Sequence, residues 1–244
     1  MQLCKERRCC KLKAVILAGG YGKRLRPLTE NIPKPLLNIL GRPILRWQFE
    51  WLKAHGIYEI IICTGHLKEK IMEDVGSGQK FGVKVGYAVE DEPLGTGGAL
   101  NNAIHLLNKE ETFIVINGDV LTDLNPTELT RTLRDDVVGA VAVIPLPSPY
   151  GIVSFNTDTL NIIEFKEKPR LFDYWINAGV YAFTFKVFDY LPQQGDLEKT
   201  TFPELASRGL LKAVPFSECK WMSIDTHKDL EDAEKLVKSM GFNL

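Results

Sequence analysis

The sequence has no hydrophobic run that approaches the roughly 20 residues a helix needs to cross a membrane. It has no excess of charge of either sign, because 30 lysines and arginines face 31 aspartates and glutamates, for a formal net charge of -1. A nucleic-acid partner is therefore disfavoured. The basic N-terminus has no following apolar segment long enough for a signal peptide. We predict a cytoplasmic protein that acts without a membrane or a nucleic acid.

The five cysteines do not have the pattern of a disulfide framework, because their number is odd and three of them crowd between residues 4 and 10. A zinc site at the N-terminus would need a fourth ligand, and the other two cysteines lie beside strand-like apolar sequence. We predict that residues 1–12 form a basic, Cys-containing N-terminal extension. Residues 13–244 are predicted to form a single domain.

Four short runs are apolar throughout: residues 14–18, 60–63, 113–116 and 137–143. Continuous rather than alternating apolar strands are typical of a parallel sheet whose two faces are both covered. Helical patterns lie between these runs, at residues 43–55, 96–107 and 126–134. The alternation predicts a doubly wound, mostly parallel α/β sheet.

The second half of the chain is less regular. Residues 150–155, 160–165 and 175–183 have the aromatic or alternating character of strands. A last helix is predicted from Thr226 to Met240, because Thr226 and Asp229 have the spacing of a capping box. There is no internal repeat, and in particular no hexapeptide repeat, so a β-helix domain is excluded.

The connection after the first apolar run carries the strongest signal, since its glycines let backbone N–H groups approach a phosphate closely. A dinucleotide fingerprint would need a glycine where Leu25 stands. A Walker loop would need serine or threonine after Lys23, where Arg24 stands. The remaining interpretation is a phosphate loop of another type. Its cations are Lys23, Arg24, Arg26 and Lys34.

Two aspartates are predicted at the carboxyl ends of strands, where ligands of open α/β sheets gather. Asp119 follows an apolar run and a glycine, and Asp225 lies between a strand-like segment and the cap of the last helix. Either residue alone could be an Asx-turn residue. Together with a phosphate loop they predict a Mg²⁺ site, because Mg²⁺ is held by one or two carboxylates plus substrate phosphates.

Six motifs follow one another in a recognisable order: the loop of residues 17–29, Pro33-Lys34-Pro35-Leu36, Asn117-Gly118-Asp119, Glu167-Lys168-Pro169, Asn177-Ala178-Gly179 and Trp221 to Thr226. In this series the chain resembles the sugar-1-phosphate nucleotidylyltransferases from about residue 13 to 235. One departure is Lys23, where that family usually has threonine. The resemblance implies a Rossmann-like nucleotide-diphospho-sugar transferase fold, with a nucleotide-binding half at residues 13–145 and a sugar-phosphate-binding half at 146–244.

The resemblance also implies roles for single residues. Arg24 and Lys34 would act on the triphosphate, Lys168 on the sugar phosphate, and Asp119 and Asp225 would hold the metal. Glu167 would accept hydrogen bonds from sugar hydroxyls. The other implied substrate-binding residues are Leu17, Ala18, Gly19, Gly20, Gly22, Lys23, Gly95, Thr96, Gly118, Gly151, Asn177 and Gly179.

Glu90 is the position that bears on the base. The resemblance places it on a strand that faces the base, where thymidylyl- and uridylyltransferases usually carry glutamine. An ionised carboxylate only accepts hydrogen bonds, and guanine offers adjacent donors at N1 and N2. Glu90 and its neighbours also resemble the guanylyltransferases of mannose 1-phosphate and heptose 1-phosphate.

The predicted reaction therefore joins GTP and a sugar 1-phosphate, mannose 1-phosphate first and heptose 1-phosphate second, to give an NDP-sugar and pyrophosphate. Two alternatives stay open. One is a glucose-1-phosphate thymidylyl- or uridylyltransferase. The other is a non-catalytic nucleotide-sugar-binding regulatory subunit. The sequence does not fix the oligomeric state, and the second half is a candidate surface for a homo-oligomer.

Overall fold

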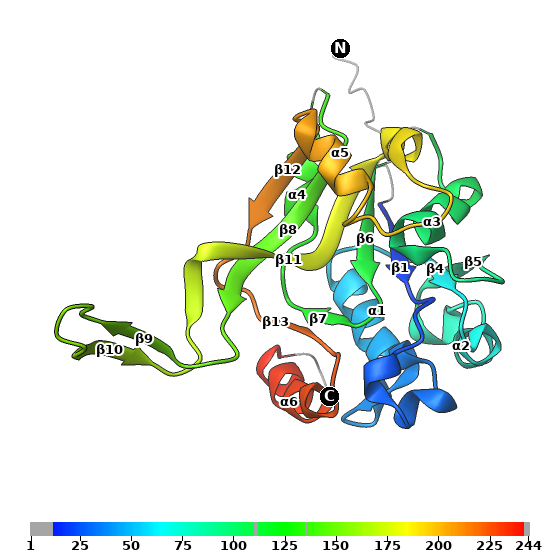
Figure 1. Ribbon diagram of the computed structural model, residues 1–244. Coiled ribbons are helices and arrows are strands. Elements are labelled where there is room, and N and C mark those ends of the chain that lie inside the picture. Colours follow the sequence, from blue (N-terminus) through cyan, green and yellow to red (C-terminus); the bar gives the residue numbers. More distant parts are fainter. Residues whose placement is uncertain (1–11, 110–111, 135, 242–244) are drawn as a thin grey trace, which may run out of the picture.

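The computed structural model describes residues 12–109, 112–134 and 136–241, and its centre is a seven-stranded sheet in the order β12-β8-β11-β6-β1-β4-β5 (Figure 1). All neighbouring strands run parallel except β11, which is antiparallel to both β6 and β8. The predicted mostly parallel sheet is therefore confirmed. The strands are β1 (Lys13–Leu17), β4 (Glu59–Thr64), β5 (Lys84–Val89), β6 (Thr112–Asn117), β8 (Gly139–Pro147), β11 (Arg170–Thr184) and β12 (Leu211–Pro215).

Helices cover both faces of this sheet, which is why its central strands are apolar throughout. On β1, Ala14 and Ile16 pack in one cluster with α1, α2 and α4, whereas Val15 packs in a second cluster with α3 and α5. All three side chains are fully buried. The doubly wound arrangement follows from this division. The five helices are α1 (Ile44–Ala54), α2 (Lys68–Val75), α3 (Gly95–Asn102), α4 (Thr127–Arg131) and α5 (Thr201–Ser207).

A sixth helix, α6 (His227–Ser239), lies with β7 (Val120–Thr122) and β13 (Trp221–Ser223) below the carboxyl edge of the sheet (Figure 1). The capping box predicted at its start is confirmed: the backbone N–H of Thr226 donates to Asp229 Oδ2 at 2.7 Å, and that of Asp229 donates to Thr226 Oγ1 at 3.3 Å. Strands β7 and β13 pair antiparallel, and Ile224 N–H donates to the Asp119 carbonyl at 2.9 Å. This ladder places Asp119 and Asp225 side by side.

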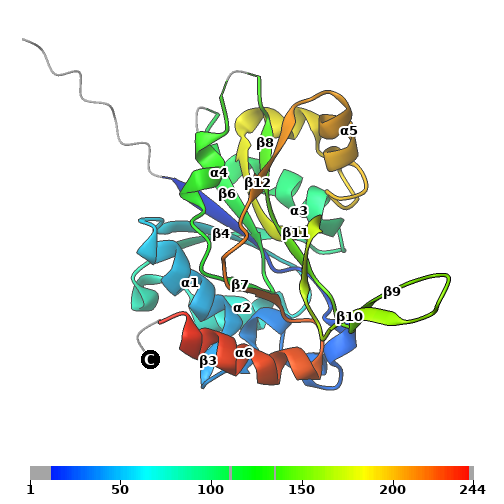
Figure 2. The same cartoon turned by 90° about the vertical axis from the view of Figure 1, so that its left-hand side faces the viewer.

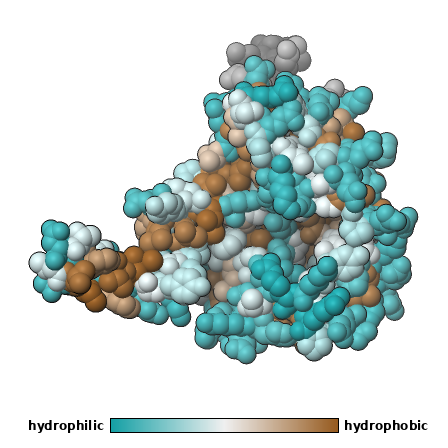
Figure 3. All heavy atoms as spheres, viewed as in Figure 1, coloured by the Kyte–Doolittle hydropathy of each residue, from teal (hydrophilic) through white to brown (hydrophobic). Residues whose placement is uncertain are grey.

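A hairpin arm of β9 (Ile152–Phe155) and β10 (Ile162–Lys166) extends from the body of the molecule (Figures 1 and 2). Its side chains are mostly exposed, and Figure 3 shows apolar surface along it. The predicted strands at residues 150–155 and 160–165 are confirmed, and each begins two residues later than predicted. Two short strands, β2 (Asn38–Ile39) and β3 (Arg42–Pro43), pair near the phosphate loop. In the described ranges no helix has the length and apolar character needed to span a bilayer.

Several elements lie where no pattern predicted them. Strand β5 at the sheet edge carries Lys84 and Gly86 and is only partly buried, so it lacks the continuous apolar run of the central strands. The predicted helix at 96–107 ends as an α-helix at Asn102 and continues as a 3-10 turn. The 3-10 turns are Lys23–Leu25, Leu28–Glu30, Lys34–Leu36, Gln79–Phe81, Ile104–Leu106 and Phe185–Tyr190.

Candidate active site

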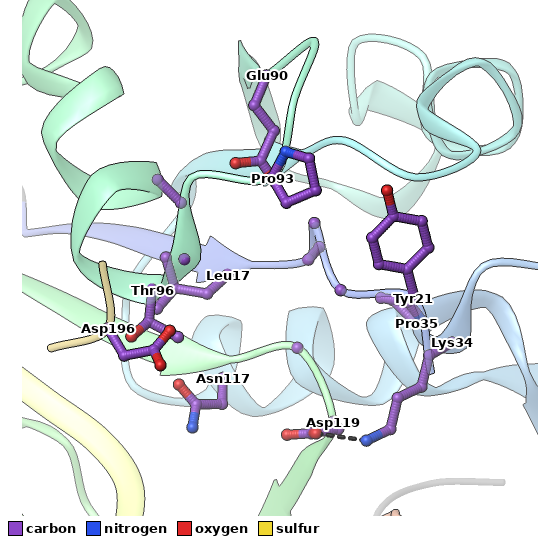
Figure 4. Close-up of a pocket in the computed structure, with 16 residues that line it drawn as sticks. Leu17, Tyr21, Lys34, Pro35, Glu90, Pro93, Thr96, Asn117, Asp119 and Asp196 are labelled. Carbon is purple, nitrogen blue, oxygen red and sulfur yellow. Dashed lines mark hydrogen bonds and ion pairs between the residues drawn. The ribbon is translucent and has the colours of Figure 1, made fainter. Parts of the chain in front are cut away.

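A cleft of about 310 Å³ opens at the carboxyl ends of β1 and β6 (Figure 4). Its volume falls at the lower end of the range that small-molecule sites occupy. The position matches the rule that open α/β sheets bind ligands at this edge. The cleft is lined by Leu17, Ala18, Gly19, Gly20, Tyr21, Lys34, Pro35, Glu90, Pro93, Gly95, Thr96, Ala99, Asn117, Gly118, Asp119 and Asp196.

The phosphate loop has a fixed shape that its sequence explains. Gly22 adopts a left-handed φ of 58°, and a Cβ there would lie 2.9 Å from the Cγ2 atom of Thr29. The Thr29 hydroxyl donates to the Gly22 carbonyl at 2.9 Å, and Leu25 is fully buried. With Leu25 pointing inward, the adjacent Arg24 side chain is left 72% exposed. The loop therefore presents a cation from a rigid turn.

Four charged side chains meet at one end of the cleft, and we call them the charge cluster (Arg24, Lys34, Asp119 and Asp225). Lys34 Nζ lies 2.5 Å from Asp119 Oδ2, a contact drawn in Figure 4, and 2.9 Å from Asp225 Oδ1. Arg24 Nη2 lies 2.7 Å from the same Asp225 oxygen. Burial raises the pKa of Asp225, but the hydrogen bond and charge of Lys34 and the charge of Arg24 outweigh it, so the net shift is downward.

The backbone that carries Asp119 is fixed by a second contact, from Gln48. The Gln48 amide on α1, which is 2% exposed, donates to the carbonyls of Asn117 and Val120 at 2.9 Å each. These carbonyls flank Asp119, so Gln48 fixes the turn that carries the carboxylate. Nothing in the sequence around Gln48 indicated this role, since a polar residue in a helix is usually exposed.

The two aspartates fit the requirements of a divalent cation. Both contact the single ammonium of Lys34, so a cation at that point faces both carboxylates. Within the described residues no group of three or more His, Cys, Asp or Glu side chains is arranged to hold a metal. Two carboxylates, completed by substrate phosphates and water, suit Mg²⁺ rather than zinc.

Glu90 lies at the other end of the cleft and is only 8% exposed. Its Oε2 accepts the Leu94 backbone N–H at 3.1 Å. A Cβ on Gly19 would lie 1.8 Å from Glu90 Oε1, so the phosphate loop passes the carboxylate at a distance only glycine permits. Burial raises the pKa of Glu90, and the Leu94 N–H partly opposes that shift.

The predicted residues of the second half lie outside the lining of the cleft. Lys168 Nζ lies 3.8 Å from Glu167 Oε1 at the base of the arm, and both side chains are more than half exposed. A Cβ on Gly151 would lie 3.0 Å from Glu167 Oε2, so these three residues form one group. On β11, the Gly179 N–H donates to Asn177 Oδ1 at 2.8 Å.

Ten predicted residues line the cleft: Leu17, Ala18, Gly19, Gly20, Lys34, Glu90, Gly95, Thr96, Gly118 and Asp119. Gly22 and Lys23 lie on the loop beyond the lining, and Arg24 and Asp225 reach the cleft through Lys34. The residues that sequence reasoning missed are Tyr21, Pro35, Pro93, Ala99, Asn117 and Asp196. Asn117 stands in a quoted motif and could have been included, whereas no pattern surrounds Asp196.

A doubly wound sheet with a glycine loop, and with cations paired with aspartates at its carboxyl edge, is typical of nucleotide-binding α/β proteins. The family model described as Nucleotidyl transferase matches residues 13–239. The chain belongs to this family, and the resemblance drawn from the six motifs is confirmed.

The relatives carry several names. A mannose-1-phosphate guanyltransferase of Yarrowia lipolytica is 37% identical over 225 residues, which are 89% of this chain and 62% of that protein. A UTP–glucose-1-phosphate uridylyltransferase of Synechocystis is 35% identical over 93% of this chain and 64% of its own length. The chain thus spans less than two thirds of these relatives.

Solved structures are also similar. HddC from Yersinia pseudotuberculosis, crystallised in complex with GMP-PN, has a TM-score of 0.72 and 28% identity, covering 92% of this chain and 98% of that one. A putative glucose-1-phosphate thymidylyltransferase from Bacillus anthracis has a TM-score of 0.74 and 27% identity, covering 96% and 98%. Both chains are covered almost completely, so the similarity extends over the whole domain.

Proposed function

We propose that this protein transfers a guanylyl group from GTP to a sugar 1-phosphate, with mannose 1-phosphate as the first candidate and heptose 1-phosphate as the second. The observation that carries the proposal is that the two ends of one cleft carry different chemical groups. A buried carboxylate that suits guanine lies at one end, and the charge cluster lies at the other. The relative named mannose-1-phosphate guanyltransferase supports the same choice.

The reaction forms a bond between a sugar-phosphate oxygen and the α-phosphorus of the nucleotide, and breaks the bond to pyrophosphate. A phosphate monoester is largely dianionic at neutral pH, because its second pKa is about 6. The nucleophile therefore needs no general base. What it needs is relief from repulsion between two anions. Arg24 and Lys34 supply that relief when their side chains leave the aspartate carboxylates and pair with phosphate oxygens.

Asp119 and Asp225 are the residues that would hold Mg²⁺. When bound, Mg²⁺ neutralises phosphate charge and orients the phosphate groups. Lys34 contacts both carboxylates, so a metal held there would displace its ammonium, which would then be free to contact the triphosphate. The same side chain would thus pair with the aspartates in the free protein and with the triphosphate in the complex.

Glu90 is proposed to read the base. The Leu94 N–H occupies one acceptor position of Oε2, and a carboxylate retains further lone pairs on both oxygens. Those lone pairs suit the two donors on the Watson–Crick edge of guanine, whereas uracil and thymine present a carbonyl oxygen there. By analogy with base-edge contacts in DNA, such a pair discriminates by about 1–3 kcal/mol.

The second half is proposed to bind the sugar phosphate. Lys168 and Glu167 are solvated at the base of the arm. The Lys168 ammonium is therefore available to the sugar phosphate, and the Glu167 carboxylate can accept hydrogen bonds from a diol. Gly151, Asn177 and Gly179 would complete this side. On this proposal residues 13–145 bind the nucleotide and residues 146–244 bind the sugar phosphate, with no membrane or nucleic-acid partner.

The test is a panel of four NTPs against mannose, heptose and glucose 1-phosphates, with pyrophosphate release as the measurement. The proposal expects release with GTP and one of the first two sugars. It expects Asp119→Ala to lower turnover by at least about 100-fold while the protein stays folded. Near wild-type turnover by Asp119→Ala refutes the site assignment. Binding of an NDP-sugar by the wild-type protein without pyrophosphate release from any pair supports a regulatory subunit instead.

A second candidate is a glucose-1-phosphate uridylyl- or thymidylyltransferase. One observation favours it: the similarity to the Synechocystis uridylyltransferase. Preference for UTP or dTTP with glucose 1-phosphate in the same panel identifies this reaction.

A further inference from the structure

A segment late in the chain braces the turn that lies over the nucleotide cleft. We call residues 93–98 the nucleotide turn and residues 192–198 the bracing segment. The N–H groups of Gly97 and Gly98 donate to the Gly195 carbonyl at 2.9 and 3.2 Å, and the Gly195 N–H donates to the Leu94 carbonyl at 2.7 Å. These reciprocal backbone bonds join the first half of the chain to the second.

Within this contact, the Thr96 hydroxyl both accepts and donates a hydrogen bond to protein groups. It accepts the Leu197 N–H at 2.8 Å and donates its single proton to Glu198 Oε2 at 3.0 Å. A hydroxyl has only one proton. Although Thr96 lines the cleft, its proton is therefore committed to Glu198, and its role in this structure is to anchor the nucleotide turn.

The other oxygen of the same carboxylate contacts the sugar-side half. Tyr181 on β11 is fully buried, and its hydroxyl lies 3.3 Å from Glu198 Oε1 and accepts the Asn177 amide at 2.8 Å. Burial, with the charge of Glu198, raises the pKa of Tyr181, so the hydroxyl keeps its proton and donates it to Glu198. A continuous path runs from Thr96 through Glu198 and Tyr181 to Asn177.

We infer that Glu198 is a positioning residue that sets the nucleotide turn and the Asn177 turn relative to each other, and so tunes the binding of both substrates. This inference rests on the proposed function, because it takes the two turns to serve the two substrates. Leu94 of the nucleotide turn also donates to Glu90, so a shift of the turn moves the group proposed to read the base.

A carboxylate is the side chain this position needs. Each oxygen of Glu198 accepts from a different donor, Thr96 on one side and Tyr181 on the other. Glutamine has the same shape but one of its two ends is a donor. A Glu198→Gln change therefore leaves one hydroxyl facing an N–H group, so that hydroxyl loses the charged acceptor for its own proton and the link between the two turns is weakened.

The experiment measures the KM for GTP, the KM for the sugar 1-phosphate and kcat in Glu198→Gln. A matched control is Glu204→Gln on α5, an exposed glutamate whose partner is Arg208 at 2.8 Å. The expected result is a rise of about 10-fold in both KM values, because a hydrogen bond to a charged group is lost. The control variant should show little change. The selectivity for GTP over ITP, which lacks the 2-amino group, should also fall.

Thr96→Val provides a second variant, since it keeps the side-chain volume and removes only the hydroxyl. If Glu198 acts through Thr96, the double variant raises the KM for GTP no further than the worse single variant does. Unchanged KM values with a lowered melting temperature, or an effect on one substrate alone, overturn the inference.

Calorimetric titration of GTP onto the wild-type and Glu198→Gln proteins separates this inference from the proposed function. Absence of pyrophosphate release by the wild-type protein counts against the function. In that case equal GTP affinities of the two proteins overturn the inference, and a weaker affinity of the variant supports it.

Discussion

Replacement of Lys34 by methionine is expected to raise the affinity of the nucleotide-free protein for Mn²⁺, a spectroscopic substitute for Mg²⁺. The Lys34 ammonium makes contacts of 2.5 and 2.9 Å with the two carboxylates that the metal needs, and its side chain is only 13% exposed. Metal binding to the wild-type protein must break these contacts. A hydrogen bond to a charged group contributes about 1.5–3 kcal/mol, so the loss of this competition corresponds to roughly 10- to 100-fold.

The assay is titration with Mn²⁺ followed by electron paramagnetic resonance, without nucleotide. GTP should strengthen Mn²⁺ binding in the wild-type protein, because it offers Lys34 other anionic partners, and should do so much less in Lys34→Met. The control is Lys68→Met, since Lys68 pairs at 2.6 Å with Asp91, whose side chain is 94% exposed and away from the charge cluster. Equal Mn²⁺ affinities of Lys34→Met, Lys68→Met and wild type would refute the reasoning.

Four further predictions concern Glu90, Asp225 and Gly19. Glu90→Gln is expected to move the nucleotide preference from GTP toward UTP or dTTP by about 5- to 150-fold in pyrophosphate release, and an unchanged preference contradicts the base-reading role. Because burial raises the pKa of Glu90 above 4.5, its ionised form costs stability at neutral pH. Glu90→Gln should therefore melt at a higher temperature than wild type near pH 7, and this gain should vanish below pH 4.5. A difference in melting temperature that does not depend on pH shows that the ionisation of Glu90 is not its cause. The pKa of Asp225 is lowered from 3.8, so its ion pairs stabilise the fold above that pH, and this contribution is lost as the pH falls through the lower folded value. Asp225→Asn should therefore flatten this part of the plot of stability against pH. An unaltered plot shows that Asp225 does not contribute to the acid denaturation. Gly19→Ala should cost about 1–3 kcal/mol by overpacking against Glu90, measured by denaturant unfolding, and the cost should shrink in the double variant with Glu90→Ala; a full cost in both backgrounds shows that another contact is responsible.

The central sheet could be predicted from the sequence because its signal is local. A strand buried on both faces must be apolar at every position, and Ala14, Val15 and Ile16 meet that condition with no exposed side-chain surface. The start of the last helix could also be predicted, because the capping box at Thr226 and Asp229 is a local pattern of four residues. Edge elements such as β5 lack such a signal, because solvent on one side relaxes the requirement for apolar residues.

The site could be predicted from the residues that follow strands and from the motifs that carry the resemblance, such as the loop with Lys34. Asp119 and Asp225 were expected to meet at the carboxyl edge of one sheet, and they do meet, but by another route. Asp225 follows β13, which pairs with β7 in a separate two-stranded ladder below the main sheet. The contacts of Gln48 and Glu198 had no sequence signal, because each depends on partners about 70 to 100 residues away in the chain.

The acidic run of residues 90–92 shows what the fold adds to the sequence. Three carboxylates precede a glycine turn of the kind that usually receives phosphate, which looks electrostatically unfavourable when the three residues are treated alike. The Glu90 N–H donates to the Thr64 carbonyl at 2.9 Å, which extends the pairing of β5 with β4 by one residue. Strand alternation then turns Glu90 inward and Asp91 outward, where Asp91 pairs with Lys68. Only one of the three charges therefore enters the cleft, at the end away from the charge cluster, and a single buried acceptor there suits a base better than a phosphate.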